Sequence, residues 1–471
     1  MPTELHTVLT HLESDREHAA QRLVRFLEIP SISTDPAYAT EVDRAAGWVA
    51  QYVEELGFAT EVVSADGGHP VIIARSTDAM VAHRADGSAP PRVLFYGHYD
   101  VQPADPVELW STPPFEPDIR DGVVYARGAC DDKGQVMTFL EAIRAYHQTG
   151  QRLPCHVTLL IEGEEECGSV TLPKVLLDHA NLLKADICVV SDTSMWETAE
   201  GATPAITYAL RGLVYFDLKL FGPSRDLHSG VYGGTLANPA TLLTRVLGRL
   251  FDEDNRVTIP GFYDAVDEVS AQERENWSKL GFDESKYLGE VGATPHGEAG
   301  FTTLERRWAR PSCDVNGLYG GYMGEGAKTV IPSFAGAKVS FRIPASMDPQ
   351  KLAADFEAWI RGHDVGGCRW EITNHGEAHP VAAPTDSPWG KAACDAIESI
   401  TGNPPALTRE GATIPVVADF KSALGIDTLL IGFGLNRDNI HSPDEHFDLK
   451  RLDLGAKCHA ALLARIGRAE A

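Results

Sequence analysis

The stretch LFYGHYD, residues 94–100, decides how the rest of the chain is interpreted. Its apolar start predicts a buried β-strand, and Gly97 then permits a turn or a close backbone approach. His98 and Asp100 follow, and side chains two residues apart in extended chain share one face. An imidazole and a carboxylate therefore emerge together at the carboxyl end of a strand, where open α/β sheets bind ligands. Alone, such a pair is more often a satisfied surface or core pair than a functional site.

Charge and composition narrow the classes of partner and the location. The 471 residues carry 41 Lys and Arg against 67 Asp and Glu, a formal net charge of −26, which argues against nucleic acid or an anionic membrane as partner. The start, MPTELHTVLTHLESDREH, contains acidic residues and no apolar core, so it predicts neither a signal peptide nor a membrane span. Eight scattered cysteines without a CxxC motif are typical of a reducing compartment. We expect a cytoplasmic protein.

The length and the hydrophobic pattern predict two domains. Strand and helix patterns alternate through residues 1–205, which is typical of a mostly parallel sheet with helices on both faces. Residues 206–380 instead show long β-rich runs with two helices, which predicts an inserted α+β domain acting as a lid or in dimerisation. The α/β pattern resumes at 381–471. We expect an α/β catalytic domain interrupted by the inserted one.

Four further polar clusters follow predicted strands of the α/β part. Each has an ordinary explanation, since acidic triplets are usually solvated loops and Asp-Asp pairs often cap helices. Because the carboxyl ends of parallel strands meet at one sheet edge, we expect the clusters to lie close together. They are CDDKG at 130–134, EGEEECG at 162–168, SD at 191–192 and NIHS at 439–442.

Together the clusters predict a metal site. So many carboxylates at one edge would repel one another unless cations lay among them. Two histidines with three carboxylates suit a pair of divalent ions such as zinc. One carboxylate must then bridge, and two ions about 3.5–4 Å apart share a water or hydroxide. This is the arrangement of a two-metal hydrolase.

The same blocks resemble the M20 family of metallopeptidases, specifically its cytosolic dipeptidase and carnosinase-like branch. They occur in the family's order and extend across most of the chain. The matching blocks are GHYDVQPAD at 97–105, RGACDDKG at 127–134, EGEEECGS at 162–169, SDT at 191–193, DLHSGVYGG at 226–234, GAKTVIP at 326–332, LTREGATIPV at 407–416 and IHSPDE at 440–445.

The resemblance implies a ligand for each metal position. His98 and Asp192 would bind one ion, Glu166 and His441 the other, and Asp131 would bridge the two. The implied cofactor is two divalent ions per chain, zinc first and manganese as an alternative.

The resemblance also implies the residues that act beside the ions. Asp100 would orient the His98 ring and raise its basicity. Glu165 would be the general base that takes a proton from the metal-bound water and returns it to the leaving amine. The peptide bond between Asp131 and Asp132 is typically cis in this family.

The inserted domain would supply the substrate contacts. By resemblance, His228 stabilises the oxyanion and reaches the active site of the other subunit of a homodimer. Arg342 would grip the substrate carboxylate, and the turn containing Gly411 and Thr413 would offer backbone N–H groups to it.

The leading hypothesis is therefore hydrolysis of a dipeptide or short peptide with a free C-terminal carboxylate, by a metal-bound hydroxide with Glu165 as base. An N-acyl-amino-acid deacylase of the same family is the alternative, and it would not need a free substrate amine. A scaffold without activity would lack a ligand or the base, and all of these residues are present.

Overall fold

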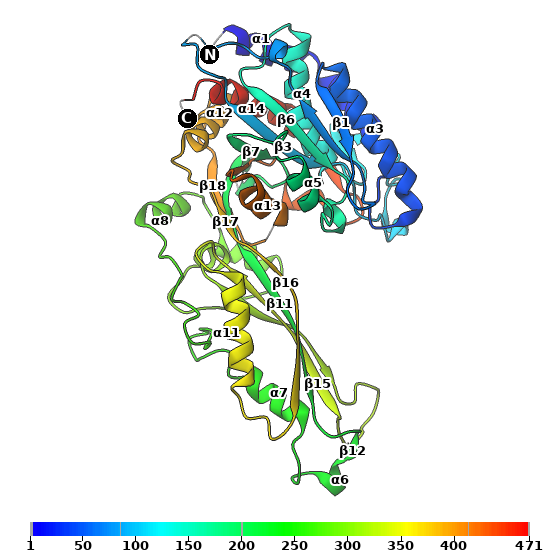
Figure 1. Ribbon diagram of the computed structural model, residues 1–471, viewed down its shortest axis with the longest axis vertical. Coiled ribbons are helices and arrows are strands. Elements are labelled where there is room, and N and C mark those ends of the chain that lie inside the picture. The colour runs from blue at the N-terminus through cyan, green and yellow to red at the C-terminus, as the bar shows by residue number, and fades with distance from the viewer. Residues whose placement is uncertain (1–2, 85, 199–200, 413, 470–471) are drawn as a thin grey trace. The chain divides into compact units, whose positions relative to one another are not determined.

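The computed structural model describes residues 3–84, 86–198, 201–412 and 414–469 of the chain. These residues form two compact units (Figure 1). The first unit comprises Met1–Tyr208, Ala383–Thr408 and Asp419–Ala471, and the second comprises Ala209–Ala382 and Arg409–Ala418.

A mixed sheet forms the centre of the first unit. Its inner strands β6, β3, β7 and β19 are mutually parallel, whereas the outer pairs are antiparallel. The sheet order in this unit is β1-β2-β6-β3-β7-β19-β10, with β18 beside β10. The strands are β1 (Ala59–Val63), β2 (Val71–Arg75), β3 (Arg92–His98), β6 (His156–Glu162), β7 (Ile187–Val190), β10 (Ala205–Leu210), β18 (Ala406–Glu410) and β19 (Thr428–Leu430). The last two residues of β10 pair with β17 (Val381–Ala382), and these four residues are counted in the second unit.

Adjacent aromatic residues in β3 show that both faces of this sheet are covered. Side chains alternate between the faces of a strand, so Phe95 and Tyr96 point in opposite directions. Phe95 stacks on Phe139 of α4 (Lys133–Gln148) with ring centroids 3.9 Å apart. Tyr96 meets Phe420 of α13 (Pro415–Leu424) edge-on, with ring centroids 5.2 Å apart. All six residues from Val93 to His98 are buried, which explains why this strand is an almost continuous apolar run.

Six helices of the first unit, α1, α2, α3, α4, α12 and α14, contribute to one broad apolar core, and most residues of α4 and α14 are buried. Figure 1 shows the positions of these helices beside the sheet. Helix α13 crosses the boundary between the two units as they are defined above. The helices are α1 (Thr3–Ser14), α2 (Arg16–Leu27), α3 (Ala39–Glu55), α4 (Lys133–Gln148), α5 (Leu172–Asp178), α12 (Pro388–Thr401), α13 (Pro415–Leu424) and α14 (Leu449–Ile466).

Two small sheets complete the first unit. One has the order β20-β5-β4 and joins chain segments far apart in sequence, because β20 near the C-terminus pairs with β5. Its strands are β4 (Asp118–Arg120), β5 (Val123–Tyr125) and β20 (His446–Asp448). The other sheet pairs β8 (Trp196–Thr198) with β9 (Gly201–Thr203).

The second unit is built on an antiparallel sheet of order β13-β15-β11-β16. Buried and half-buried residues alternate along β11, and the buried ones share a core with α7 and α11 (Figure 1). The strands are β11 (Gly212–Phe221), β12 (Leu227–His228), β13 (Ser312–Gly320), β14 (Val330–Ile331), β15 (Phe334–Ile343) and β16 (Arg369–Ala378). The helices are α6 (Ser229–Tyr232), α7 (Pro239–Leu247), α8 (Ala271–Ser278), α9 (Glu284–Gly289), α10 (Thr303–Trp308) and α11 (Pro349–Arg361).

The predicted fold class is confirmed: a mostly parallel central sheet with helices on both faces, together with an α+β part. Among the described residues, no helix combines the length and apolar character needed to cross a membrane.

Candidate metal centre

The parallel strands of the first unit bring the predicted ligands to one edge of the sheet. His98 is the last residue of β3 and lies opposite Glu162, the last residue of β6. Asp192 follows the end of β7 by two residues, on the other side of β3. Asp131 lies in the loop between β5 and α4, and His441 lies between β19 and β20.

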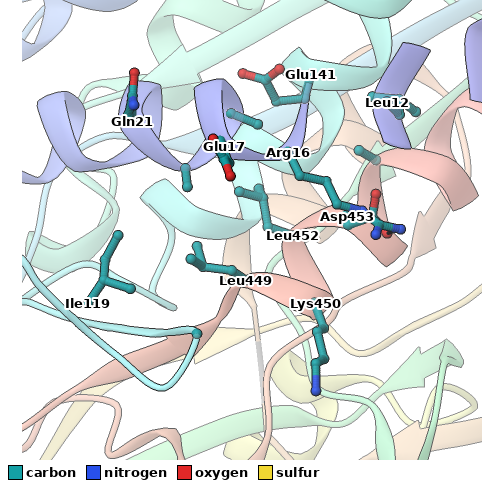
Figure 2. A pocket seen from close by; sticks show the side chains of 14 residues that line it. Leu12, Arg16, Glu17, Gln21, Ile119, Glu141, Leu449, Lys450, Leu452 and Asp453 are labelled. Atoms are coloured by element: carbon teal, nitrogen blue, oxygen red, sulfur yellow. Dashed lines mark hydrogen bonds and ion pairs between the residues drawn. The ribbon is translucent and has the colours of Figure 1, made fainter. Parts of the chain in front are cut away.

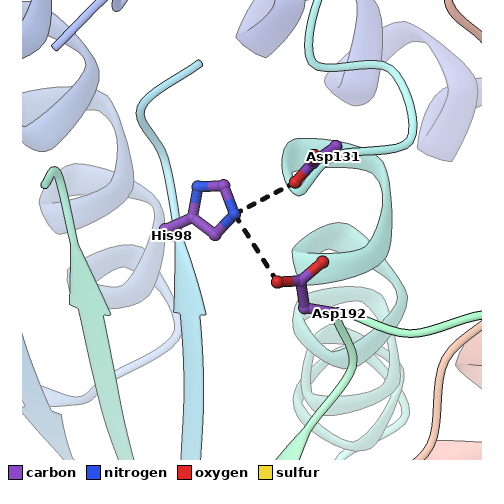
Figure 3. Close-up of side chains that lie close together, drawn as sticks. All are labelled: His98, Asp131 and Asp192. Carbon is purple, nitrogen blue, oxygen red and sulfur yellow. Dashed lines mark ion pairs between the residues drawn. The ribbon is translucent and has the colours of Figure 1, made fainter. Parts of the chain in front are cut away.

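The first group of possible ligands is His98, Asp131 and Asp192 (Figure 3). The Nε2 atom of His98 lies 3.2 Å from Oδ1 of Asp131 and 3.8 Å from Oδ2 of Asp192. Figure 3 shows the same ring nitrogen facing both carboxylates. The imidazole is fully buried, and the two carboxylates are largely so. Three ligand atoms of hard and borderline character thus converge on one point.

The second group is Asp131, Glu166 and His441. The Nε2 atom of His441 lies 2.9 Å from Oδ2 of Asp131 and 3.3 Å from Oε2 of Glu166. Asp131 therefore belongs to both groups, and it turns one oxygen toward each histidine. A carboxylate shared in this way is what two neighbouring ions require.

A buried nitrogen atom of His98 without a hydrogen-bond partner indicates that these residues fit a metal ion. The Nε2 atom of His98 is buried without a hydrogen-bond partner in the described part of the chain. The opposite ring nitrogen, Nδ1, lies 3.1 Å from the carbonyl oxygen of Asp100 and 3.3 Å from its Oδ1. Metal-binding histidines are oriented in this way, with one nitrogen held by an acceptor and the other aimed at the ion. The donor set fits a divalent cation.

The carboxylates and histidines of the site change one another's pKa values. Burial alone would lower the pKa of His98, but its contacts with Asp100 and Asp131 raise that pKa well above the usual value. Hydrogen bonds to Asp131 and Glu166 raise the pKa of His441 to about 10. Burial raises the pKa of Asp192, and the charge of Asp131 adds to that rise. This excess of carboxylate charge favours any cation, so a divalent ion would compete with protons for both rings.

Glu165 lies beside these groups in the short helical turn Glu165–Cys167. Burial raises the pKa of its carboxyl group, and the negative charges of Glu166 and Asp131 raise it further, against the opposing effect of His98. A carboxylate whose pKa is moved upward toward neutrality is better suited to accept and return a proton than an ordinary one.

Two residues to which the sequence analysis gives no role at the site also contact the proposed metal ligands. The side-chain amide of Gln102 donates to Oε2 of Glu166 at 2.7 Å. Oδ2 of Asp132 accepts from the backbone N–H of His98 at 3.2 Å. The period of two in His98, Asp100 and Gln102 is the signal that could have identified the glutamine. The expected cis bond between Asp131 and Asp132 is present.

The predicted substrate-binding residues lie in the second unit, and their roles stay predictions. Nδ1 of the exposed His228 accepts from the N–H of Gly230 at 2.9 Å. Arg342 is near the end of β15, and burial lowers its pKa. The N–H of Gly411 donates to the side chain of Glu410 at 2.6 Å. Thr413 lies outside the described residues.

A separate pocket of about 710 Å³ lies between helices of the first unit (Figure 2). Its lining is mostly apolar and includes Leu12, Leu449 and Leu452, with an ion pair between Arg16 and Asp453 at 2.8 Å. It contains none of the residues of the two ligand groups.

The sequence of the chain matches a family model over residues 94–465, and the family is described as peptidase family M20/M25/M40. The chain belongs to this family. The predicted resemblance is thereby confirmed, and the match includes every residue of the two ligand groups.

The similarity of this M20 protein to its relatives extends over nearly all of its length. It is 31% identical to the Cys-Gly metallodipeptidase DUG1 of Saccharomyces cerevisiae, over 98% of each chain. It is 30% identical to the human Beta-Ala-His dipeptidase, over 99% of this chain and 94% of that protein. Its fold is similar to that of the metallo-carboxypeptidase Sso-CP2 of Sulfolobus solfataricus, with a TM-score of 0.78, 31% identity and coverage of 99% and 100% of the two chains. These relatives place it in the predicted dipeptidase and carnosinase-like branch.

Proposed function

We propose that this M20 protein hydrolyses the peptide bond of dipeptides that carry a free C-terminal carboxylate, at a centre of two divalent ions. In this proposal His98 and Asp192 hold one ion, Glu166 and His441 hold the other, and Asp131 is shared. The observation that carries the proposal is the position of Asp131, whose two oxygens face two different histidines at 3.2 and 2.9 Å. The expected enzyme class, a metal-dependent dipeptidase, is confirmed by the relatives.

Side chains next to the proposed ligands hold those ligands in position. When bound, divalent ions polarise a carbonyl oxygen and make a water molecule acidic at neutral pH. Asp100 fixes the His98 ring through its Nδ1 atom, so that Nε2 keeps its lone pair for the ligand position. Gln102 holds Glu166 by donating to Oε2. These contacts orient one ligand of each group before an ion arrives.

Glu165 moves the proton in this proposal. Its carboxylate accepts a proton from the attacking water and returns it to the departing amine, and its raised pKa supports both transfers. Positioned general bases of this kind contribute roughly 10²–10⁴-fold to the rate. His228 and Arg342 are proposed to bind the oxyanion and the substrate carboxylate, as the family resemblance implies.

The names of the relatives guide the choice of substrate. Yeast DUG1 is named for Cys-Gly and the human relative for β-Ala-His. We propose that this enzyme takes dipeptides of this general kind, with a free amine and a free carboxylate. Zinc as the natural ion, a homodimer formed through the inserted part and a cytoplasmic location remain predictions from the sequence.

An assay on matched substrates tests this function. Purified enzyme would be supplied with zinc or manganese and offered Cys-Gly, β-Ala-His and Ala-Gly beside N-acetyl-alanine and N-acetyl-glycine. We expect release of free amino acids from at least one dipeptide and little from the acetylated compounds. A clear preference for the acetylated amino acids would contradict the dipeptidase assignment and support the deacylase alternative. The Glu165→Gln variant serves as the blank.

A further inference from the structure

The carboxylate of Glu445 is buried beside the metal centre, yet the proposed mechanism does not use it. The residue directly precedes β20, whose His446 pairs with Tyr125 of β5. The pairing continues one step further, since the N–H of Ala126 donates to the carbonyl oxygen of Glu445 at 3.1 Å. The Glu445 side chain therefore enters the loop that connects β5 to α4, which is the loop that carries Asp131.

Four donors from this loop converge on the one carboxylate. Oε1 of Glu445 accepts from the backbone N–H groups of Cys130 at 2.9 Å and Asp131 at 3.0 Å. Oε2 accepts from the N–H of Gly128 at 2.9 Å and from Nη1 of Arg127 at 2.7 Å. A carboxylate offers about four lone-pair positions, so all of them are occupied. Glu445 itself is 0% exposed.

The same carboxylate connects the two chain segments that meet at Asp131. His441 lies four residues before Glu445 in the segment that enters β20, and its ring faces Oδ2 of Asp131. Glu445 at the end of that segment holds the N–H of Asp131 itself. The two contacts fix Asp131 at its backbone and at its side chain from one stretch of chain. Charge-assisted hydrogen bonds are roughly twice as strong as neutral ones, so this link holds Asp131 more strongly than a neutral acceptor would.

We propose that Glu445 is a positioning residue of the metal centre, which sets the place of the shared ligand Asp131 by holding its backbone N–H. The inference rests on the proposed centre of two ions. Residues that orient metal ligands typically contribute about 10–100-fold to metal affinity. Because Asp131 belongs to both ligand groups, loosening its loop weakens both ion positions together.

A second buried carboxylate, that of Glu141, serves as a control for Glu445. It separates an effect on the position of Asp131 from an effect on the stability of the whole protein. Glu141 on α4 is also buried and accepts from Arg22 at 2.7 and 2.6 Å and from the hydroxyl of Tyr52 at 2.9 Å. These two partners, Arg22 and Tyr52, belong to neither ligand group. Glu141→Gln and Glu445→Gln therefore both disturb a buried carboxylate with an arginine partner, but only the second change reaches Asp131.

The experiment measures metal affinity on the full-length protein. Apoprotein of the wild type, E445Q and E141Q would be titrated with Co²⁺ by visible absorption and with Zn²⁺ by calorimetry, after circular dichroism has shown that each is folded. We expect E445Q to bind both ions about 10–100-fold more weakly and to change the Co²⁺ spectrum. We expect E141Q to bind them like the wild type, even where its melting temperature falls. Glu445→Asp keeps the charge with a shorter reach, and we expect an intermediate affinity.

Three other outcomes would contradict the positioning role of Glu445. Wild-type affinity in folded E445Q would overturn the positioning role, and so would equal weakening in E141Q. If neither E445Q nor E445D folds while E141Q does, Glu445 is needed for the fold and not specifically for metal affinity, which also overturns the proposal. If the wild type itself binds no pair of ions, the proposed centre fails, and that result is separate from a failure of the Glu445 inference alone.

Discussion

Nε2 of His441 lies 2.9 Å from Oδ2 of Asp131, although 310 positions separate the two residues in the sequence. The contact uses only one oxygen of the carboxylate, because the other oxygen faces His98. Asp131 is thus the structural link between the two ligand groups.

Replacing Asp131 by Asn removes a charge from both groups at once, so we expect both ions to be lost together. The measurement is metal content by mass spectrometry after gel filtration, with Asp453→Asn in α14 as a control that lies in neither ligand group. Retention of one ion per chain in D131N would show that the carboxylate is not shared.

Glu165→Gln removes the proposed base but none of the ligands, so we expect turnover to fall by roughly 10²–10⁴-fold while metal content is unchanged. Glu164→Gln is the neighbouring control. Glu164 accepts from the N–H of His69 at 2.9 Å and of Thr171 at 3.0 Å and thus holds two loops. E164Q should be less stable than the wild type but should lose far less turnover than E165Q, because Glu164 binds loop backbone groups and not the attacking water. Steady-state kinetics on one dipeptide distinguishes the two, and equal losses would remove Glu165 from its role.

His459 gives a prediction for pH. Burial among the rings of Phe95, Phe139 and Phe433 lowers its pKa to about 3. The unfolded chain takes up a proton near pH 6.5, so between these values it binds a proton that the folded protein does not. The contribution of His459 to the free energy of unfolding is therefore fully present above about pH 6.5. It decreases as the pH falls toward 3, by at most about 1.4 kcal/mol per pH unit.

Urea denaturation at pH 7, 6 and 5 measures this loss. His459→Gln cannot titrate, so the difference in free energy of unfolding between it and the wild type should shrink as the pH falls. Both proteins keep the same metal centre, and the subtraction removes its contribution. A constant difference between H459Q and the wild type over this pH range would contradict the buried, neutral state of this histidine.

Metal removal should lower thermal stability, because a ligand that binds only the folded state stabilises it. At a free-ion concentration of 100 times Kd the gain is about 2.7 kcal/mol. Differential scanning calorimetry with and without chelator, followed by re-addition of zinc, measures the change. D131N should melt at the same temperature under both conditions, and a chelator-dependent shift in D131N would mean that other ions are being removed.

The sequence predicted the sheet well where residue types alone determine the structure. The apolar run before His98 forms β3, and the polar residues that follow β3 and β7 meet at one edge as expected. Breaks inside elements were harder to predict. The apolar pattern at 5–28 predicts one helix, but the chain forms α1 and α2 with Asp15 between them, whose carboxylate pairs with Arg22 and His18.

The long β-rich run at 206–220 likewise contains a break, because it forms two strands, β10 and β11, separated at Arg211. The side chain of this arginine donates to the carbonyl oxygen of Gly411 at 3.2 Å, a partner far along the chain. Glu445 escaped prediction for the same reason. Within the sequence SPDEHF it resembles an ordinary loop acid, and only the pairing of β20 with β5 brings it to the Asp131 loop. Long-range pairing of this kind leaves no local pattern.

Metal content of the purified enzyme, measured together with dipeptide hydrolysis before and after chelation, tests the central claim most directly. We expect about two divalent ions per chain, with activity lost on chelation and restored by zinc or manganese. One ion or none, without hydrolysis of any dipeptide under any metal, would contradict it.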